Sequence, residues 1–214
     1  MNSQPILKSG FTLAIIAAVC TGLVALTWQL TTARIAANEQ AWLEQSLQPA
    51  LSGLSFDNNV SESMIVLQPP HDLPGSKPAI IYRAYAGNQP VAALFLVTAR
   101  DGYSGPIRVL IGIDVAGSVT GVRVIQHNET PGLGDRIEAS RSDWVLQFDD
   151  LSLRNPEPAR WAIKRDGGDF DQLTGASVTP RAVIKAIRET LHYFDANADA
   201  IFAAMAQSDA QDAN

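Results

Sequence analysis

Three hydroxyl side chains lie close together near the end of the chain, in the stretch DFDQLTGASVTPRAV (residues 169–183). They are Thr174, Ser177 and Thr179. Between them, Gly175 and Ala176 have almost no side chain, so a bulky group can approach the backbone closely. A hydroxyl here can donate to a phosphate oxygen or be esterified by a phosphate. The stretch therefore predicts a site for a phosphorylated group, although a capped helix preceded by a small turn would explain the same residues.

A helix is predicted directly after these hydroxyls. Its apolar residues recur at helical spacing: Val183, Ile184, Ile187, Leu191 and Phe194. Thr179 is expected to cap the helix, with Pro180 at its first position. Because the start of a helix offers unpaired N–H groups and the positive end of a dipole, it would stabilise an anion beside the hydroxyls.

Two more glycine-bearing loops could contribute to the same site. HNETPGLGDRI (residues 127–137) follows a predicted strand, and RDGYSGPI (residues 100–107) contains the aromatic Tyr103. His127 and Glu129 could form an acid–base pair or bind a metal. Two ligands are too few for a metal site, so none is predicted. Together the loops suggest a cofactor pocket, although hairpin turns alone would explain any one of them.

The elements that position these loops are predicted to be strands followed by the helix. Four β-type runs span residues 79–86, 91–99, 108–115 and 118–127, and DVAGSVTG forms a hairpin turn between the last two. The alternation in the third run favours a sheet with one face more deeply buried. A short strand is expected at residues 160–164. The fold class is therefore α+β, with a twisted, mainly antiparallel sheet packed by helices.

The N-terminus carries 25 residues without a charge, between Lys8 and Arg34. This is longer than the apolar part of a signal peptide and long enough to span a bilayer as a helix. Helical spacing continues beyond it as a stalk. The expected organisation is a cytoplasmic tail (1–9), a transmembrane helix (10–33), a stalk helix and linker (34–63), a domain (64–206) and a disordered tail (207–214).

The composition narrows the function. A formal net charge of −6 without a Lys/Arg run excludes a typical nucleic-acid-binding surface. With one cysteine, Cys20, an intramolecular disulfide is impossible and a cysteine-based iron–sulfur site is not expected. Redox chemistry would have to come from a bound group. Beyond the span the chain carries 15 basic and 22 acidic residues, which favours translocation of the domain.

Three ordered motifs give the chain a resemblance to a known family. The motifs are GYSGPI, HNETPGLG and Asp171-x-x-Thr174-Gly175-Ala176-Ser177. Together with the N-terminal anchor and stalk, they resemble the RnfG family, the component of the Rnf ion-translocating ferredoxin:NAD oxidoreductase complex that has a covalently attached flavin. A related flavin-bearing component of the sodium-pumping NADH:quinone reductase shares the motifs but tends to be longer.

The resemblance implies a set of cofactor-binding residues. A flavin transferase would attach FMN through its phosphate to Ser177, with Thr179 as the alternative acceptor; the family usually has Thr at the last position of the motif. The remaining implied residues are Asp171, Thr174, Gly175 and Ala176 beside the attachment point, and Glu129, Thr130, Gly132, Leu133, Tyr103 and Gly105 around the isoalloxazine ring.

The resemblance also implies a function. The chain would be an electron-carrier subunit rather than an independent enzyme, single-pass in the cell inner membrane, with its N-terminus cytoplasmic and its domain periplasmic. Its partners would be the other Rnf subunits, the lipid bilayer and, during maturation, the flavin transferase, and the complex would move Na⁺ or H⁺. The alternative is a membrane-anchored extracytoplasmic sensor or ligand-binding domain that recognises a phosphorylated or anionic ligand without redox activity.

Overall fold

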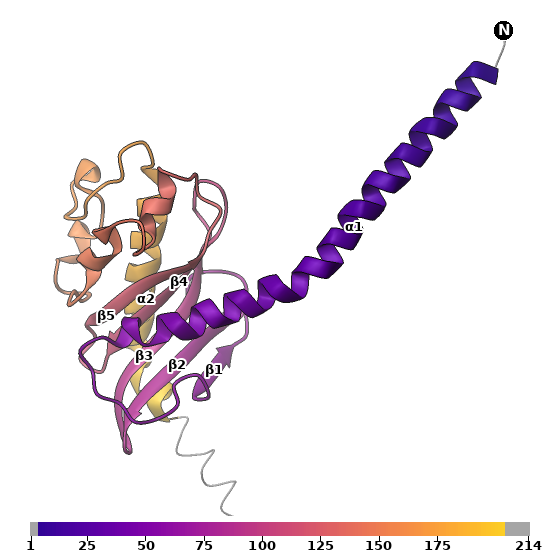
Figure 1. Cartoon of the computed structure of the whole chain (residues 1–214). Helices are drawn as coiled ribbons and strands as arrows, with labels where there is room; N and C mark the ends of the chain where they lie inside the picture. The colour runs from indigo at the N-terminus through magenta and orange to yellow at the C-terminus, as the bar shows by residue number, and fades with distance from the viewer. Residues whose placement is uncertain (1–3, 204–214) are drawn as a thin grey trace, which may run out of the picture. The chain divides into compact units, whose positions relative to one another are not determined.

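The computed structural model describes residues 4–203, with the side chains of residues 4–9, 33, 36, 39 and 40 outside the description (Figure 1). The expected tail at residues 207–214 and the first three residues of the expected N-terminal tail also lie outside it. The chain forms two compact units, Met1–Trp42 and Leu43–Asn214. Because helix α1 runs from Gln4 to Leu47, its last residues belong to the second unit.

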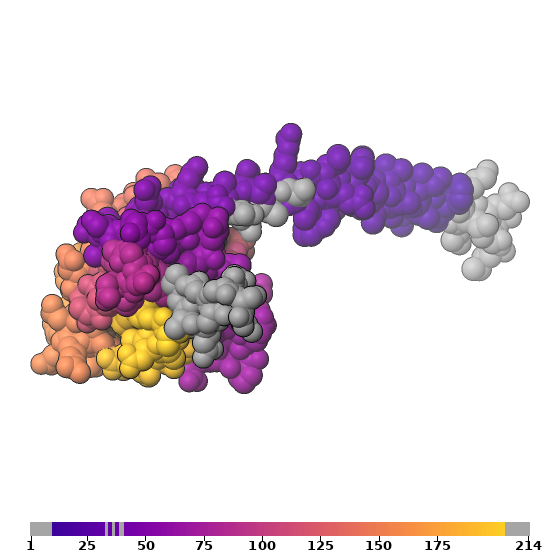
Figure 2. Space-filling model, turned by 90° about the horizontal axis from the view of Figure 1, so that it is seen from below, coloured from indigo at the N-terminus to yellow at the C-terminus, as the bar shows by residue number. Residues whose placement is uncertain are grey.

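The first unit is a single helix. It contains the stretch Gly10–Thr32, which is long and apolar enough to cross a membrane and of which no part is buried. The space-filling view shows this part of α1 as one continuous rod (Figure 2). Three threonine hydroxyls in its last turns donate back to carbonyls of the same helix, at Leu23, Thr27 and Trp28. These hydroxyls therefore need no partner outside the helix.

The second unit contains a five-stranded antiparallel sheet whose strands follow one another in chain order (Figure 1). The strands are β1 (Met64–Leu67), β2 (Ala79–Ala86), β3 (Gln89–Ala99), β4 (Ile107–Asp114) and β5 (Val119–Gln126). The predicted meander is confirmed. At the β4–β5 turn the Asp114 carboxylate accepts the N–H groups of Ala116 and Ser118 over 2.9 and 2.8 Å, which fixes the hairpin.

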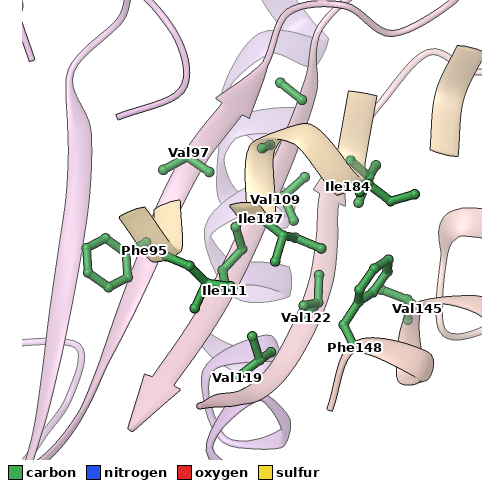
Figure 3. Close-up of a cluster of buried hydrophobic side chains, with 14 of the residues drawn as sticks. Phe95, Val97, Val109, Ile111, Val119, Val122, Val145, Phe148, Ile184 and Ile187 are labelled. Atoms are coloured by element: carbon green, nitrogen blue, oxygen red, sulfur yellow. The ribbon is translucent and has the colours of Figure 1, made fainter. Parts of the chain in front are cut away.

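One face of the sheet is covered by helix α2 (Val178–Ala203), shown in yellow in Figure 1. Its apolar residues pack against those of β3, β4 and β5, as the close-up of Ile184, Ile187, Phe95 and Ile111 shows (Figure 3). The predicted helical spacing is therefore confirmed, since all five residues that carry it are buried. Burial of this apolar stripe is the main force that holds α2 on the sheet.

The opposite face of the sheet is covered as well, by the end of α1, the 3₁₀ helix η1 (Pro49–Leu51) and residues up to Val60. The cross-strand glycines Gly112 and Gly121 make room for η1. A Cβ atom at Gly112 would lie 2.3 Å from the Ala50 carbonyl oxygen. The expectation of one more deeply buried face is therefore wrong, because the segment 43–63 packs on the sheet rather than connecting freely to it.

The region between β5 and α2 contains four short 3₁₀ helices. They are η2 (Gly134–Ile137), η3 (Asp143–Phe148), η4 (Pro158–Arg160) and η5 (Lys164–Asp166). The strand expected at residues 160–164 is not formed; within the described residues this segment has one isolated bridge, between Ile163 and Phe170. Trp161 and Ile163 are both buried, which gives the alternating apolar pattern that resembles a strand. The Trp161 ring packs against the rings of Phe148 and Phe170.

Candidate functional site

Three segments meet beside the start of α2 and enclose a cavity of about 210 Å³. They are the loop before β4, the loop after β5 and the residues that precede α2. The lining residues are Tyr103, Glu129, Thr130, Leu133, Gly134, Gly175, Ala176, Ser177, Val178 and Thr179. Eight of these are residues that the sequence analysis assigned to a cofactor site. Gly134 and Val178 were not among the expected residues.

Ser177 lies immediately before α2 and lines the cavity. It is half-buried, and its hydroxyl forms no hydrogen bond with any residue that the structure describes. The turn before it is closed by the Ala176 N–H, which donates to the Leu173 carbonyl over 3.0 Å. Gly175 has a φ of 83° in this turn, a conformation that favours glycine. Ser177 therefore presents a hydroxyl oxygen at the positive end of a helix.

Thr179 has different surroundings, although it is only two residues further on. It is fully buried, and its hydroxyl donates to Oε2 of Glu129. The expectation that Thr179 caps the helix at its N-terminus is wrong, because α2 already begins at Val178 and the hydroxyl is used by a carboxylate. Pro180 is the third residue of α2, not the first, and is tolerated because N–H groups in the first turn have no partner within the helix.

Glu129 is a buried carboxylate, 5% exposed. Its Oε1 accepts the Ser104 N–H over 3.0 Å, and its Oε2 accepts the Thr179 hydroxyl. Two glycines make room for it: a Cβ atom at Gly134 would lie 2.8 Å from Cβ of Glu129, and one at Gly102 would lie 3.0 Å from Oε1. A buried carboxylate needs hydrogen-bond donors. Glu129 takes them from the loop before β4 and from the start of α2, so it joins all three segments of the site.

His127 positions Glu129 through the backbone. The Glu129 N–H donates to Nδ1 of His127 over 3.0 Å, and Nε2 of the same ring lies 2.8 Å from Oε1 of Glu138. Since Nδ1 accepts a hydrogen bond, the ring carries its proton on Nε2 and donates it to Glu138. The His127 ring therefore contacts the backbone of Glu129 and not its carboxylate, so the two side chains do not form an acid–base pair.

Four expected site residues lie outside this cavity. Asp171 is exposed, pairs with Lys164 over 2.5 Å and borders a separate open cavity of about 850 Å³. Thr174 is exposed. Gly132 and Gly105 occupy turns with φ of 77° and 131°. The structure therefore brings together eight of the expected residues around Ser177 and Glu129, and these four are not part of the cavity lining.

Gly102 and His127 both contact Glu129 but do not line the cavity. The sequence analysis did not predict this supporting role for either residue. The need for glycine at position 102 can be seen only in the folded chain, where a Cβ atom would lie 2.2 Å from the Gly105 carbonyl oxygen. For His127, the signal is its position two residues before a Glu at the end of a strand. Such a spacing is too common to predict a contact.

Comparison with known proteins identifies the family. Residues 102–192 match the FMN-binding domain family, and residues 1–49 match the RnfG N-terminal region. The chain is 42% identical to the G component of the ion-translocating oxidoreductase complex of Pseudoalteromonas atlantica and 44% identical to that of Pseudomonas aeruginosa. Each alignment covers 94% of this chain and 94% of the relative. The chain therefore belongs to the RnfG family of ion-translocating oxidoreductase complexes, and its large unit contains an FMN-binding domain.

Proposed function

We propose that the chain is a membrane-anchored flavoprotein subunit that carries electrons through FMN bonded to Ser177, within an Rnf-type complex that moves Na⁺ or H⁺. The observation that carries this proposal is the hydroxyl of Ser177, which lies at the start of α2, lines the cavity and forms no hydrogen bond with any described residue. The relatives of this chain are named as subunits of an oxidoreductase complex, which supports the redox role.

The surroundings of the two candidate hydroxyls favour Ser177 as the attachment residue. Ser177 is half-buried and lines the cavity, so a transferase can reach its oxygen. Thr179 is fully buried and its hydroxyl is already used by Glu129. Esterification of Thr179 would remove the proton that this hydrogen bond needs and would place a phosphate beside a buried carboxylate. Ser lacks only the methyl group of the Thr usual in the family, which the phosphoester does not require.

The attachment reaction conserves atoms without any redox change. A flavin transferase would use FAD: the Ser177 oxygen bonds to the phosphorus of the FMN half, the pyrophosphate bond breaks, and AMP leaves while the hydroxyl proton is released. The product is a phosphodiester with one negative charge. That charge lies where the first N–H groups of α2 and the helix dipole stabilise an anion.

The residues around Ser177 suit a group of which one part lies in the cavity and the other part lies on the protein surface. The cavity of about 210 Å³ is smaller than the usual pocket for a whole cofactor. Beside it, three apolar side chains are exposed: Tyr103 (72%), Leu133 (42%) and Val178 (42%). These side chains would hold the flavin ring at the surface, and Glu129 would keep the three segments in place.

Bound FMN would supply the electron-carrying chemistry, and the protein's contribution would be position and electrostatics. A flavin held at the surface can come within tunnelling distance of cofactors in neighbouring subunits. Covalent attachment would retain it in the periplasm, where the domain is expected to lie beyond the span Gly10–Thr32. The N-terminus would then be cytoplasmic.

The test uses the full chain co-expressed with a flavin transferase. After denaturing electrophoresis, the wild type should give a fluorescent band under ultraviolet light, and its intact mass should exceed that of the polypeptide by FMN minus water. Ser177→Ala should lose both signals, whereas Ser177→Thr should keep them. An unmodified wild-type chain from its native host would contradict the proposal and would favour a ligand-binding domain without redox activity.

A further inference from the structure

Asp171, six residues before Ser177, lies outside every helix and strand that the structure describes, yet both of its backbone groups are bonded to side chains. Its N–H donates to Oε1 of Gln147 over 2.8 Å, and its carbonyl accepts the Nε1–H of Trp144 over 2.6 Å. Because backbone groups need hydrogen-bond partners, these two bonds replace the pairing that a neighbouring strand would supply here.

Both side chains come from the same 3₁₀ helix, η3, which is anchored in the core. The Trp144 ring is 7% exposed, and its centre lies 5.2 Å from that of the fully buried Phe148 ring. At the start of η3 the Ser142 hydroxyl accepts the Trp144 N–H over 3.2 Å. The helix is therefore a fixed support for the backbone of Asp171.

The amide of Gln147 can be oriented in only one way. Its Nε2 donates to the Trp144 carbonyl over 2.7 Å, which leaves Oε1 to accept the Asp171 N–H. Since the amide nitrogen only donates and the amide oxygen only accepts, exchange of the two atoms would break both bonds. The side chain that holds Asp171 is thus held in place by its own helix.

The side chain of Asp171 is accessible, in contrast to its backbone. It is 66% exposed, pairs with Lys164 and borders the open cavity of about 850 Å³. From Asp171 the chain continues through the buried Leu173 and the turn closed by the Ala176 N–H to Ser177. The segment 171–177 can therefore be reached from solvent, while η3 fixes its start and the turn fixes its end.

We propose that Trp144 and Gln147 are positioning residues for flavin attachment, which hold the segment 171–177 in the conformation that the flavin transferase binds. This inference rests on the proposed function, because it requires that a transferase acts at Ser177. A segment already in its bound conformation loses less conformational entropy when the enzyme binds it. Loss of either bond should therefore raise the KM of the transferase for this chain and leave kcat unchanged. Neither side chain lines the cavity at Ser177, so the proposed role concerns the segment and not the flavin ring.

Two tryptophans allow the hydrogen bond to be separated from packing. Trp144→Phe removes the N–H that Asp171 accepts but keeps an aromatic ring. Trp161 packs against Phe148 and Phe170 in the same aromatic cluster, and its Nε1 is buried without a partner in the described part of the chain. Trp161→Phe is therefore the matched control, since it makes the same change of ring without loss of such a bond.

The measurement uses the full-length chain, purified in detergent from cells that lack the transferase, with FAD and purified transferase added. The initial rate of fluorescent-band formation is followed against the concentration of the chain. Trp144→Phe should raise the KM by about two- to tenfold, the effect of one hydrogen bond, whereas Trp161→Phe should keep the wild-type KM. Equal KM values for the two variants would overturn the proposal.

Gln147→Met tests the second bond and the conformation of the free chain. It removes the acceptor of the Asp171 N–H, so hydrogen exchange of that N–H, measured by NMR without transferase, should become about two- to tenfold faster. The KM should rise by a similar factor. Leu146→Ala, at an exposed position of the same helix, should change neither quantity. A raised KM with unchanged exchange would mean that the transferase contacts Gln147 directly, which overturns the positioning role.

The wild-type chain distinguishes failure of this inference from failure of the proposed function. If the wild type acquires the fluorescent band and both variants acquire it with the wild-type KM, only the positioning role is overturned. If the wild type stays unmodified with FAD and active transferase, the proposed function fails, and the positioning role fails with it.

Discussion

The hydroxyl of Thr179 donates to the carboxylate of Glu129, fifty residues earlier in the chain, and both side chains are buried. This contact joins the first turn of α2 to the loop that follows β5. Because Ser177 lies directly before that turn, the contact also sets the position of the proposed attachment oxygen relative to the cavity. Thr179 and Ser177 therefore have separate roles, one structural and one chemical.

Replacing Thr179 by Val should separate these roles. Val has the same shape but no hydroxyl, so Oε2 of Glu129 would lose a donor while it stays buried. We expect a loss of about 1–3 kcal/mol in the free energy of unfolding, measured by thermal unfolding, with the covalent flavin retained. Ser177→Ala should behave in the opposite way, with little change in stability and no flavin band. A folded Thr179→Val protein without the band would place the attachment on Thr179.

The ring of His127 can be tested with variants that preserve one of its two contacts. His127→Asn keeps an acceptor near Nδ1 for the Glu129 N–H, whereas His127→Gln keeps a donor near Nε2 for Glu138. If the ring positions Glu129, Asn should preserve flavin incorporation better than Gln, and Ala should lower the free energy of unfolding by about 1–3 kcal/mol. The fluorescence band, normalised to protein, gives the comparison. Equal incorporation in the Asn and Gln variants would argue against positioning by Nδ1.

The strands and α2 could be predicted from the sequence because their signals are local. Alternation in the runs around residues 79–127 and the AGS turn between β4 and β5 determine a meander, and apolar spacing after Pro180 determines the helix. The sequence predicts only a stalk helix and linker at residues 34–63. The close packing of η1, within this stretch, depends on Gly112 and Gly121, which lie far away in the sequence and make room that no local pattern predicts.

In the candidate site, too, local sequence signals could be recognised, whereas contacts between distant residues could not. Ser177, Gly175 and Ala176 could be identified because their chemistry is contiguous, and Glu129 and Tyr103 because their motifs resemble those of a family. The bond between Thr179 and Glu129 could not be predicted, since the capping preference of Thr at a helix start is a local rule, whereas this contact joins residues fifty positions apart.

Gly112 should be essential for the packing of η1 on the sheet. In Gly112→Ala the new Cβ atom would lie 2.3 Å from both the Ala50 carbonyl oxygen and Oγ1 of Thr120, and the first of these is backbone. The clash would also break the 2.5 Å hydrogen bond from Thr120 to Ala50. We expect a loss of about 1–3 kcal/mol in the free energy of unfolding. Gly22→Ala in α1, where nothing lies within 4 Å of a new Cβ, should leave the unfolding of the domain unchanged.

Asp149 should make stability fall as the pH rises. Burial raises its pKa above the ordinary value of 3.8; the charge of Arg123 opposes the rise and that of Asp150 adds to it. One of its oxygens, Oδ1, is buried without a partner among the described residues. A carboxyl whose pKa is raised by folding is protonated in both states below 3.8, and its ionisation costs stability between that pH and the raised pKa.

Asp149→Asn removes this titration. At pH 7 the variant should unfold about 1–3 °C above the wild type, and the difference should disappear below about pH 3.8, the ordinary value for this carboxyl. Asp166→Asn provides a control of opposite sign, because the hydrogen bond from Arg181 lowers the pKa of Asp166 and its contribution is lost as the pH falls through that lowered value. Thermal unfolding of the three proteins from pH 3 to pH 8 gives both curves. If Asp149→Asn lowers the Tm at pH 7, the ionised carboxylate stabilises the fold through Arg123, and burial is not the dominant effect on Asp149.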